Sequence, residues 1–438
     1  MNFNFACILK HCINPSFRYE NVDMKMIKRP LIFIFTAVIF VAVIALGGCT
    51  MSGPSKEAVK KVPENLTFPP PPDEPRFYFE RSIHSSSDVK PDTETDKLRR
   101  ALTGERLVGE GLSKPYSIAV NHGRVFVGDT VHRDVKAFDF PEHKFFHIGE
   151  DEDENGNGKL DMPLGIDVDK QGNLYVFDGK LKQILVYNRD GKFQRYIGNP
   201  DEFVKPAGLA VTADGSRIYA VDIGGSSSNQ HKVLVFDVKS GAHLFDIGKR
   251  GIGNGEFNLP RDATIAPDGS LYVVDGGNFR VEKFSADGKF ISTFGSIGRQ
   301  LGEFSRPKEA AVDKDGNVYV VDAAFGNFQI FNPQGQLLLA IGGRSNSDAP
   351  AKFSLPAGIA VDDDGRIYVV DQYFRKVDVF RPAALSEEDG FIGTKAIEKK
   401  TIGNQPPPEP GKDQPVTEPG KDQPVTEPGK DQETDPSR

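Results

Sequence analysis

The chain has 438 residues, of which 38% are hydrophobic and 26% charged, so it can bury a large core and is longer than one average domain. Its 45 glycines, 31 prolines and 32 phenylalanines favour many short strands joined by turns. The net charge of -8 and the absence of a run of Lys and Arg exclude a general attraction to phosphate, so we expect no nucleic-acid partner.

The N-terminal segment has the pattern of an export signal. The basic stretch Met24–Arg29 precedes the apolar run Leu31–Leu46, which is followed by Gly47, Gly48 and Cys49. The ending LGGC resembles the lipobox of bacterial lipoproteins, and this resemblance implies cleavage before Cys49 and lipidation of its thiol. The alternative is an uncleaved transmembrane helix, because the apolar run nearly spans a bilayer.

Residues 1–49 are therefore predicted to be a signal peptide, with Met24 as a candidate start of translation. Thr50 follows the cysteine, and lipoproteins without Asp at this place are typically sent to the outer membrane. The resemblance thus implies a protein of the cell envelope, lipid-anchored in the outer membrane and facing the periplasm.

Low-complexity segments flank the central part of the chain. Residues 50–75 are polar and proline-rich, which predicts an extended, semi-rigid spacer. Residues 384–438 repeat the sequence EPGKDQPVT and contain few apolar side chains, so we expect a disordered tail. The folded body is predicted to cover residues 76–383. Near its start, TDKLRRALTGE predicts a short outer helix, with Thr95 as its cap and Gly104 as its stop.

Six copies of one unit follow between residues 114 and 381. In each copy a proline opens an apolar run, a Gly-containing turn follows, a second run ends in Asp, and further β-prone runs come next. The prolines are Pro115, Pro163, Pro206, Pro260, Pro307 and Pro356, and the aspartates are Asp129, Asp178, Asp222, Asp275, Asp322 and Asp371. Four short antiparallel strands in about 45 residues are one blade of a β-propeller. We therefore predict an all-β, six-bladed β-propeller.

The sixth copy loses the pattern at Pro382, so another segment must complete its sheet. The β-prone run Arg76–Ile83 is the first candidate for this closing strand, and Lys395–Gly403 is the second.

The repeated unit resembles the NHL repeat of six-bladed propellers. The resemblance is carried by P-x-G-I-A-V-D-x-x-G-x-I-Y-V-V-D at Pro356–Asp371, by NFRVEKF at Asn278–Phe284 and by the connector GNGEFNLP at Gly253–Pro260. It implies a fold that hosts binding modules, sensors and some lyases or lactonases, so it does not by itself select a function.

Two acidic patterns suggest metal binding at first sight. The six strand-ending aspartates recur in every copy, so we interpret them as caps of one repeated turn, with Arg280 and Arg375 as partners in their own copies. The segment DEDENGNGKLD resembles a calcium loop, with Asp151, Asp153 and Asn155 at alternate positions but no Glu at the twelfth. These three residues are a candidate Ca²⁺ site, and no other cofactor is expected.

The best candidate binding site lies at the start of the first strand in copies four and five. Only there do charged residues follow the proline, as Arg261, Asp262, Lys308 and Glu309. The first strand of a blade lines the channel, so these side chains are predicted at its mouth. Aromatic residues of the loops after the second strands should lie on the same face: Phe279, Phe325, Phe328, Tyr373 and Phe374.

Two interpretations of these charges remain open. Charges beside exposed aromatic rings suit a ligand or partner site. Alternatively, Arg261 with Glu309 and Lys308 with Asp262 form cross-blade ion pairs that only fix blade packing.

We expect a monomeric, non-catalytic propeller that binds an envelope protein or a small ligand and reaches the membrane through its lipid anchor. No catalytic residue is assigned, because the histidines do not converge and no Ser-His-Asp arrangement can be placed. The alternative is a metal-dependent lyase or lactonase, with Asp262 and Glu309 among the metal ligands.

Overall fold

The computed structural model describes residues 66–90, 94–104, 109–225 and 228–393, all within one compact unit that begins at Val62. The predicted signal peptide, Cys49, residues 50–65 of the spacer, the second closing candidate Lys395–Gly403 and residues 394–438 of the tail lie outside the described residues. None of the helices in the described segments is both long and apolar enough to cross a membrane.

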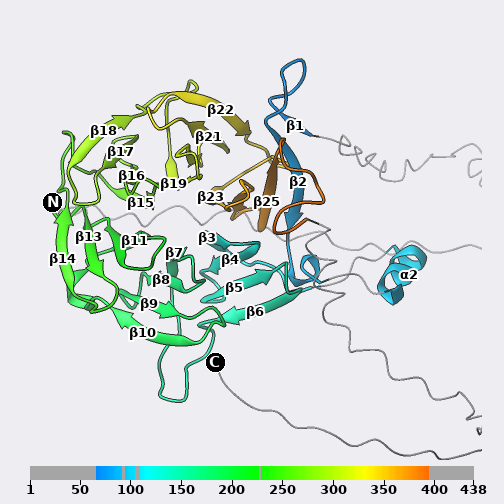
Figure 1. Cartoon of the computed structure of the whole chain (residues 1–438), viewed down its shortest axis with the longest axis horizontal. Coiled ribbons are helices and arrows are strands. Elements are labelled where there is room, and N and C mark those ends of the chain that lie inside the picture. Colours follow the sequence, from blue (N-terminus) through cyan, green and yellow to red (C-terminus); the bar gives the residue numbers. More distant parts are fainter. Residues whose placement is uncertain (1–65, 91–93, 105–108, 226–227, 394–438) are drawn as a thin grey trace, which may run out of the picture. The chain divides into compact units, whose positions relative to one another are not determined.

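Six antiparallel sheets stand around a central channel (Figure 1), which confirms the predicted six-bladed β-propeller. The strands run outward from the channel in each blade. They are β3 (Pro115–Asn121), β4 (Arg124–Asp129), β5 (Asp134–Asp139) and β6 (Lys144–Ile148) in blade one; β7 (Pro163–Val168), β8 (Leu174–Asp178), β9 (Gln183–Tyr187) and β10 (Phe193–Ile197) in blade two; and β11 (Pro206–Val211), β12 (Arg217–Asp222), β13 (Lys232–Asp237) and β14 (His243–Ile247) in blade three.

The same order holds in the other half of the ring. Its strands are β15 (Pro260–Ile265), β16 (Leu271–Asp275), β17 (Arg280–Phe284) and β18 (Phe290–Phe294) in blade four; β19 (Pro307–Val312), β20 (Val318–Asp322), β21 (Asn327–Phe331) and β22 (Leu337–Gly342) in blade five; and β23 (Pro356–Val361), β24 (Ile367–Asp371) and β25 (Lys376–Pro382) in blade six. The inner strands β3, β7, β11, β15, β19 and β23 contact one another in this order, and β23 contacts β3.

The hydrophobic core lies between neighbouring blades. The second strands consist largely of Val, Ile, Leu and Tyr and are buried along their length, as in β16 and β20. Each core cluster joins two blades: Val127 of blade one, for example, packs with Val370 and Val377 of blade six. One blade therefore cannot bury its own apolar faces, and the ring is stable only when it is complete.

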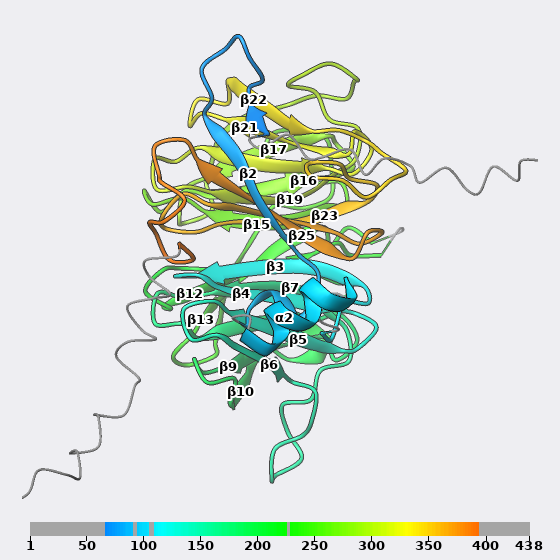
Figure 2. The ribbon, with the colours of Figure 1, turned by 90° about the vertical axis from the view of Figure 1, so that its right-hand side faces the viewer.

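The N-terminal strand β2 (Phe77–Ile83) completes the sixth sheet by pairing antiparallel with β25, with Phe79 opposite Phe380. Figure 2 shows β2 running along β25. The first of the two closing candidates is therefore the one that the ring uses. A further short strand, β1 (Thr67–Phe68), pairs with β2 and extends the sheet by a fifth strand, within the segment that the sequence assigned to the spacer.

Two boundaries differ from the prediction. Helix α2 (Glu94–Thr103) begins before Thr95, so Thr95 cannot be its cap, whereas Gly104 follows the last helical residue with a φ of +68°. The predicted disordered tail begins too early at residue 384, because Ile392 is fully buried in the core between blades six and one. The remaining described elements are the 3-10 turns η1 (Ser86–Asp88) and η2 (Pro200–Glu202).

Candidate functional site

The strand-ending aspartates hold the turns of each blade together. All six carboxylates are fully buried. Asp322 is typical: its side chain accepts hydrogen bonds from the backbone N–H groups of Ser305 and Arg306, which precede β19, and of Ala324 and Phe325, which follow β20. These bonds confirm the interpretation of the aspartates as turn caps. They also place the start of each inner strand and the loop after each second strand at the same end of the channel.

The expected arginine partners differ between blades. Arg280 contacts Asp275, with 3.4 Å between Nε and Oδ2. Arg375 is exposed and, in the described part of the chain, forms no ion pair with Asp371, so that predicted partner is wrong. The Asp371 carboxylate is satisfied by backbone N–H groups instead.

The channel has two different ends. We call the end at which the inner strands begin with proline the proline end, and the end at which they turn through the Gly-containing hairpins the hairpin end. A cavity of about 20 Å³ lies at the proline end and one of about 800 Å³ at the hairpin end. Asp262 and Glu309 border both cavities, so these two side chains separate them.

Asp262 and Glu309 bind the backbone of the next blade. Asp262 Oδ2 accepts a hydrogen bond from Ala310 N–H in blade five (3.0 Å), and Glu309 Oε2 accepts one from Ile359 N–H in blade six (3.0 Å). Burial, together with repulsion between the two carboxyl groups, raises the pKa of Glu309 well above its ordinary value. Burial also raises the pKa of Asp262.

The cationic neighbours do not pair with these acids. Within the described segments no ion pair joins Arg261 to Glu309 or Lys308 to Asp262, so the cross-blade ion-pair interpretation is wrong. Burial and the nearby charges of Arg306 and Arg261 lower the pKa of Lys308 to about 8. The proline end therefore carries cationic side chains that form no ion pair with any residue the structure describes.

The predicted aromatic residues do not form one surface with these charges. Tyr373 is 64% exposed, with its ring against Phe374 at 5.2 Å between centroids. Phe279 and Phe325 are half-buried, and Phe328 is fully buried in the core between blades five and six, so its predicted exposure is wrong. None of these rings lines the small cavity, whose walls include Tyr116 and Leu164 instead.

The calcium-like segment is an exposed loop after β6. Asp153 Oδ1 accepts hydrogen bonds from the backbone N–H groups of Asn155 and Asn157, so it stabilises a turn within the loop. Asp151 is exposed as well. In the segments that the structure describes, no three His, Cys, Asp or Glu side chains gather closely enough to hold a metal ion. The candidate Ca²⁺ site thus gains no support from the geometry, and neither does a metal held by Asp262 and Glu309.

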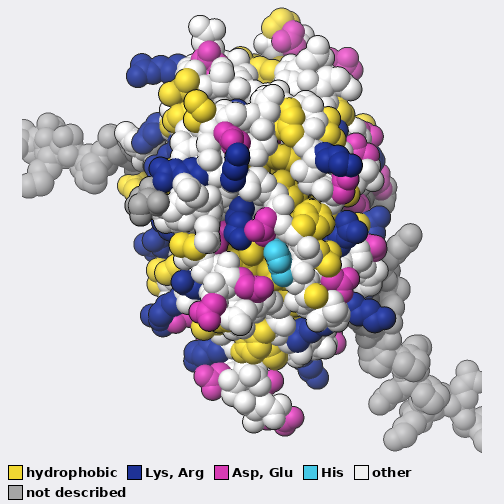
Figure 3. All heavy atoms as spheres, turned by 90° about the vertical axis from the view of Figure 1, so that its left-hand side faces the viewer, with side chains coloured by type: hydrophobic (Ala, Val, Ile, Leu, Met, Phe, Trp, Pro, Cys, Tyr) yellow, Lys and Arg dark blue, Asp and Glu magenta, His cyan; other side chains and the backbone are white. Residues whose placement is uncertain are grey.

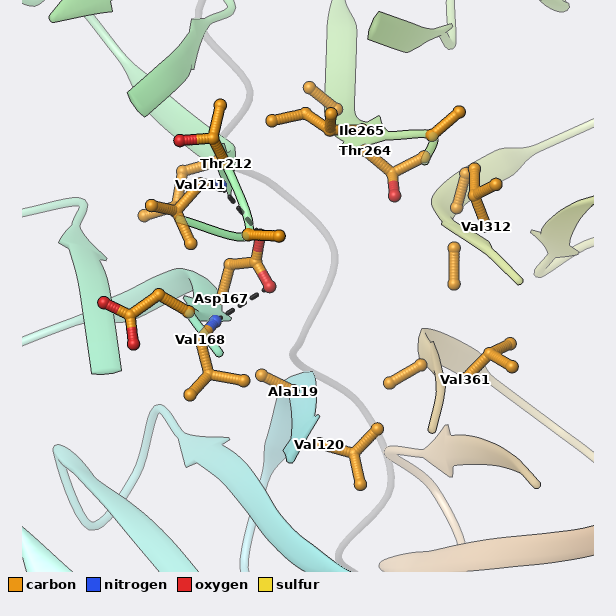
Figure 4. A pocket seen from close by; sticks show the side chains of 18 of the residues that line it. Ala119, Val120, Asp167, Val168, Val211, Thr212, Thr264, Ile265, Val312 and Val361 are labelled. Carbon is orange, nitrogen blue, oxygen red and sulfur yellow. Dashed lines mark hydrogen bonds between the residues drawn. The ribbon is translucent and has the colours of Figure 1, made fainter. Parts of the chain in front are cut away.

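The large cavity at the hairpin end, which we call the chamber, was not predicted from the sequence. Each inner strand contributes at least one β-branched side chain to its wall, among them Val120, Val168, Val211, Ile265, Val312 and Val361 (Figure 4). The wall between them carries Asp167 of blade two, whose carboxyl group lies between the strands β7 and β11. A chamber of this size that combines β-branched side chains with buried polar groups has the character of a small-molecule site.

Asp167 is the functional candidate that sequence reasoning missed. Its Oδ2 accepts a hydrogen bond from Val211 N–H and its Oδ1 one from Val168 N–H, both at 2.8 Å. Burial, together with the nearby charge of Asp169, raises the pKa of Asp167 to about 7. The signal was present in the repeat, because the fourth residue after the proline is Ala or Thr in the five other blades.

Comparison with known proteins agrees with this geometry. Residues 226–294 match the model of a family described as a 6-bladed beta-propeller, and residues 353–375 match the NHL repeat. The chain is an NHL-repeat six-bladed β-propeller. This propeller is similar to NHL repeat-containing protein 3 of Homo sapiens, with 36% identity over 89 residues, which cover 20% of this chain and 24% of that protein. The protein of the same description in Mus musculus is 34% identical over 125 residues, or 28% of this chain and 33% of its own length.

The match thus spans only about a quarter to a third of these relatives. Solved structures are similar to the chain at low identity. They include a structural genomics protein of unknown function from Bacteroides thetaiotaomicron (17% identity, TM-score 0.49, 68% of this chain and 75% of that one) and a gluconolactonase from Xanthomonas campestris (16%, 0.47, 69% and 98%). A streptogramin B lyase is similar at 12% identity and a TM-score of 0.45 over 62% and 94% of the two chains. These likenesses carry no argument about the activity of the NHL-repeat propeller.

Proposed function

We propose that this NHL-repeat propeller is a non-catalytic binding protein of the cell envelope, which acts as a monomer and holds an acidic group of a partner protein or small ligand at its proline end. One observation carries the proposal: Arg261 and Arg306 lie close enough to Lys308 to lower its pKa by repulsion, and none of the three forms an ion pair within the described residues. Arg261 and Lys308 are half-buried and Arg306 is exposed. Cations that gather without counter-charges favour the binding of an anion, and arginine suits a carboxylate in particular.

The outer side of the ring differs from the proline end in how its charges are distributed. On the side shown in Figure 3, Lys and Arg side chains are interspersed with Asp and Glu, so charges of both signs lie near one another. At the proline end the acids beneath the cations have raised pKa values and are used for backbone hydrogen bonds. Those acids therefore neutralise little of the positive charge, and an incoming carboxylate can do so.

A titration with charged peptides tests this binding mode. We expect the detergent-solubilised full chain to bind a pentaglutamate peptide but not pentalysine, with an affinity that falls as salt rises. The double variant Arg261→Ala/Lys308→Ala should lose at least tenfold in affinity. A matched control, Lys144→Ala/Lys289→Ala, removes two exposed cations from outer hairpins and should bind as the wild type does. Equal affinity of the two double variants would rule out the proline end as the site.

The lipid anchor is a separate part of the proposal and rests on the LGGC ending at Cys49. Cells fed a labelled fatty acid should incorporate the label into the wild-type chain and not into Cys49→Ser. Labelled Cys49→Ser protein, or an unlabelled wild type that keeps its full length, would favour the uncleaved transmembrane helix instead.

A further inference from the structure

The chamber at the hairpin end combines β-branched side chains from all six inner strands with unneutralised acids. Asp167 lies in its wall, and Asp262 and Glu309 close its inner end. In the described part of the chain each of these carboxyl groups hydrogen-bonds only to backbone N–H groups and has no ionic partner. Acids in a partly desolvated site without counter-cations are costly to ionise.

The charged groups at the rim do not neutralise the interior. Three cations border the chamber: Lys170 and Lys314 in hairpin turns, and Arg217 at the start of β12. Five further acids border it there: Asp169, Asp214, Asp313, Asp362 and Asp363. Several of these rim acids are bound within their own turns; the Asp169 side chain, for example, accepts hydrogen bonds from Asn173 and Tyr175. The chamber as a whole therefore has an excess of acidic groups.

We propose that the chamber binds a small organic cation, an amine attached to an apolar body, with its ammonium group at Asp167 and its body against the β-branched side chains of the wall. The occupant follows from complementarity: a cation supplies the charge that the interior carboxyls lack, and an apolar body replaces water along the wall. The site lies at the opposite end of the channel from the proposed anion site and does not depend on it.

Binding should be linked to proton release. An ammonium group favours the ionised form of a neighbouring carboxyl, so it lowers the pKa that burial has raised. The pKa of Asp167 is about 7, and the charged groups that interact with it include Asp169 on its own turn and Asp262 and Glu309 across the channel, all of which favour the protonated form. At neutral pH the occupant therefore displaces part of a proton from Asp167.

Calorimetric titration with benzylamine, and with benzyl alcohol as its neutral analogue, tests the proposal on the full chain. We expect benzylamine to bind more tightly than benzyl alcohol at pH 8, and its affinity to fall about tenfold between pH 8 and pH 6 as a carboxyl with a pKa near 7 takes up its proton. At pH 7, heats measured in two buffers of different ionisation enthalpy should show release of about half a proton. Equal affinities for the two probes, or the absence of proton release, would overturn the proposal without any variant.

Variants then locate the probe. Asp167→Asn should remove the preference for the amine and its pH dependence, whereas Asp190→Asn, a control at an exposed turn of the same blade, should change neither. Val312→Phe, which fills the chamber, should weaken both probes. Arg261→Ala/Lys308→Ala should leave benzylamine binding unchanged. Loss of benzylamine binding in that last variant alone would assign the probe to the proline end and refute the chamber.

Discussion

The carboxyl group of Asp262 in blade four accepts a hydrogen bond from the backbone N–H of Ala310 in blade five, with 3.0 Å between the two atoms. On its other side the same carboxyl lies against Gly208 of blade three, where a β-carbon would come within 2.1 Å of Asp262 Oδ1. Asp262 thus occupies space that a glycine leaves open in one neighbour and satisfies a backbone donor in the other. Glu309, one blade further on, makes both contacts with the same neighbour: it lies against Gly358 and accepts a hydrogen bond from Ile359 N–H, both in blade six.

Loss of this contact should cost stability. Asp262→Ala leaves the Ala310 N–H without its acceptor in a buried place, and we expect the free energy of unfolding to fall by about 1–3 kcal/mol. Asp262→Asn keeps an acceptor oxygen and should lose less. Urea unfolding of both variants measures the difference, and equal losses would show that the hydrogen bond contributes nothing.

Stability should decrease as the pH rises toward 8. The pKa values of Asp167, Asp262 and Glu309 are raised in the folded protein, so the native state holds protons that the unfolded chain loses above about pH 4. The stabilisation that these carboxyl groups provide in their protonated form is complete below about pH 4. It is lost as the pH rises through their pKa values in the folded protein. For Asp167, whose pKa rises from 3.8 to about 7, we expect a loss of about 2–3 kcal/mol between pH 5 and pH 8.

Urea unfolding at both pH values, on the wild type and on Asp167→Asn/Asp262→Asn/Glu309→Gln, tests this origin. The triple variant should show a flatter pH profile. A profile as steep as that of the wild type would assign the pH dependence to other groups.

The closing strand is held by a buried ion pair. Arg366 Nε lies 2.7 Å from Glu80 Oε2, and the two side chains are 0% and 2% exposed. Glu80→Gln leaves a buried guanidinium with less compensation, and we expect a loss of about 3–5 kcal/mol. The exposed pair Lys289 and Asp287 is the matched control, because breaking it with Asp287→Asn should cost at most about 1 kcal/mol. Similar losses of stability in the two variants would mean that the attachment of the closing strand β2 does not depend on the ion pair of Glu80 with Arg366.

The strand-ending aspartates should be more sensitive than exposed ones. Asp322→Ala removes the acceptor of four backbone N–H groups, and a hydrogen bond to a charged group is worth about 1.5–3 kcal/mol, so we expect a loss above about 3 kcal/mol. Asp190→Ala, in an exposed turn, should cost far less. Thermal unfolding of both variants compares them. Addition of a chelator to the wild type should leave its melting temperature unchanged, since these carboxylates serve as turn caps.

The repeat made most of the fold predictable. A proline, a Gly-containing turn and a strand-ending Asp recur in all six blades, and each marks a contact within one blade. The closing strand could also be predicted, because Arg76–Ile83 is rich in β-prone aromatic residues and lies just upstream of the first repeat. Thr95 and the start of the tail were misplaced, since a cap or a buried Ile392 depends on contacts that composition does not record.

The residues of the candidate site could be predicted from the sequence, but their partners could not. Departures from the repeat identified Arg261, Asp262, Lys308 and Glu309, and the same comparison at the fourth residue after the proline would have identified Asp167. The partners of these residues were not predictable. Each inner strand lies more than 40 residues from the next, and only the closed ring decides whether a carboxyl meets a cation or a backbone N–H.

By itself, then, the sequence determined the number of blades, the order of their strands and the residues that depart from the repeat, because those features depend on local periodicity. Only the tertiary structure decided that the acids bind backbone donors of the next blade, that the cations beside them form no ion pair with described residues, and that a chamber opens at the hairpin end. Burial and distance set charge states and pairing, and both arise only when distant segments are brought together.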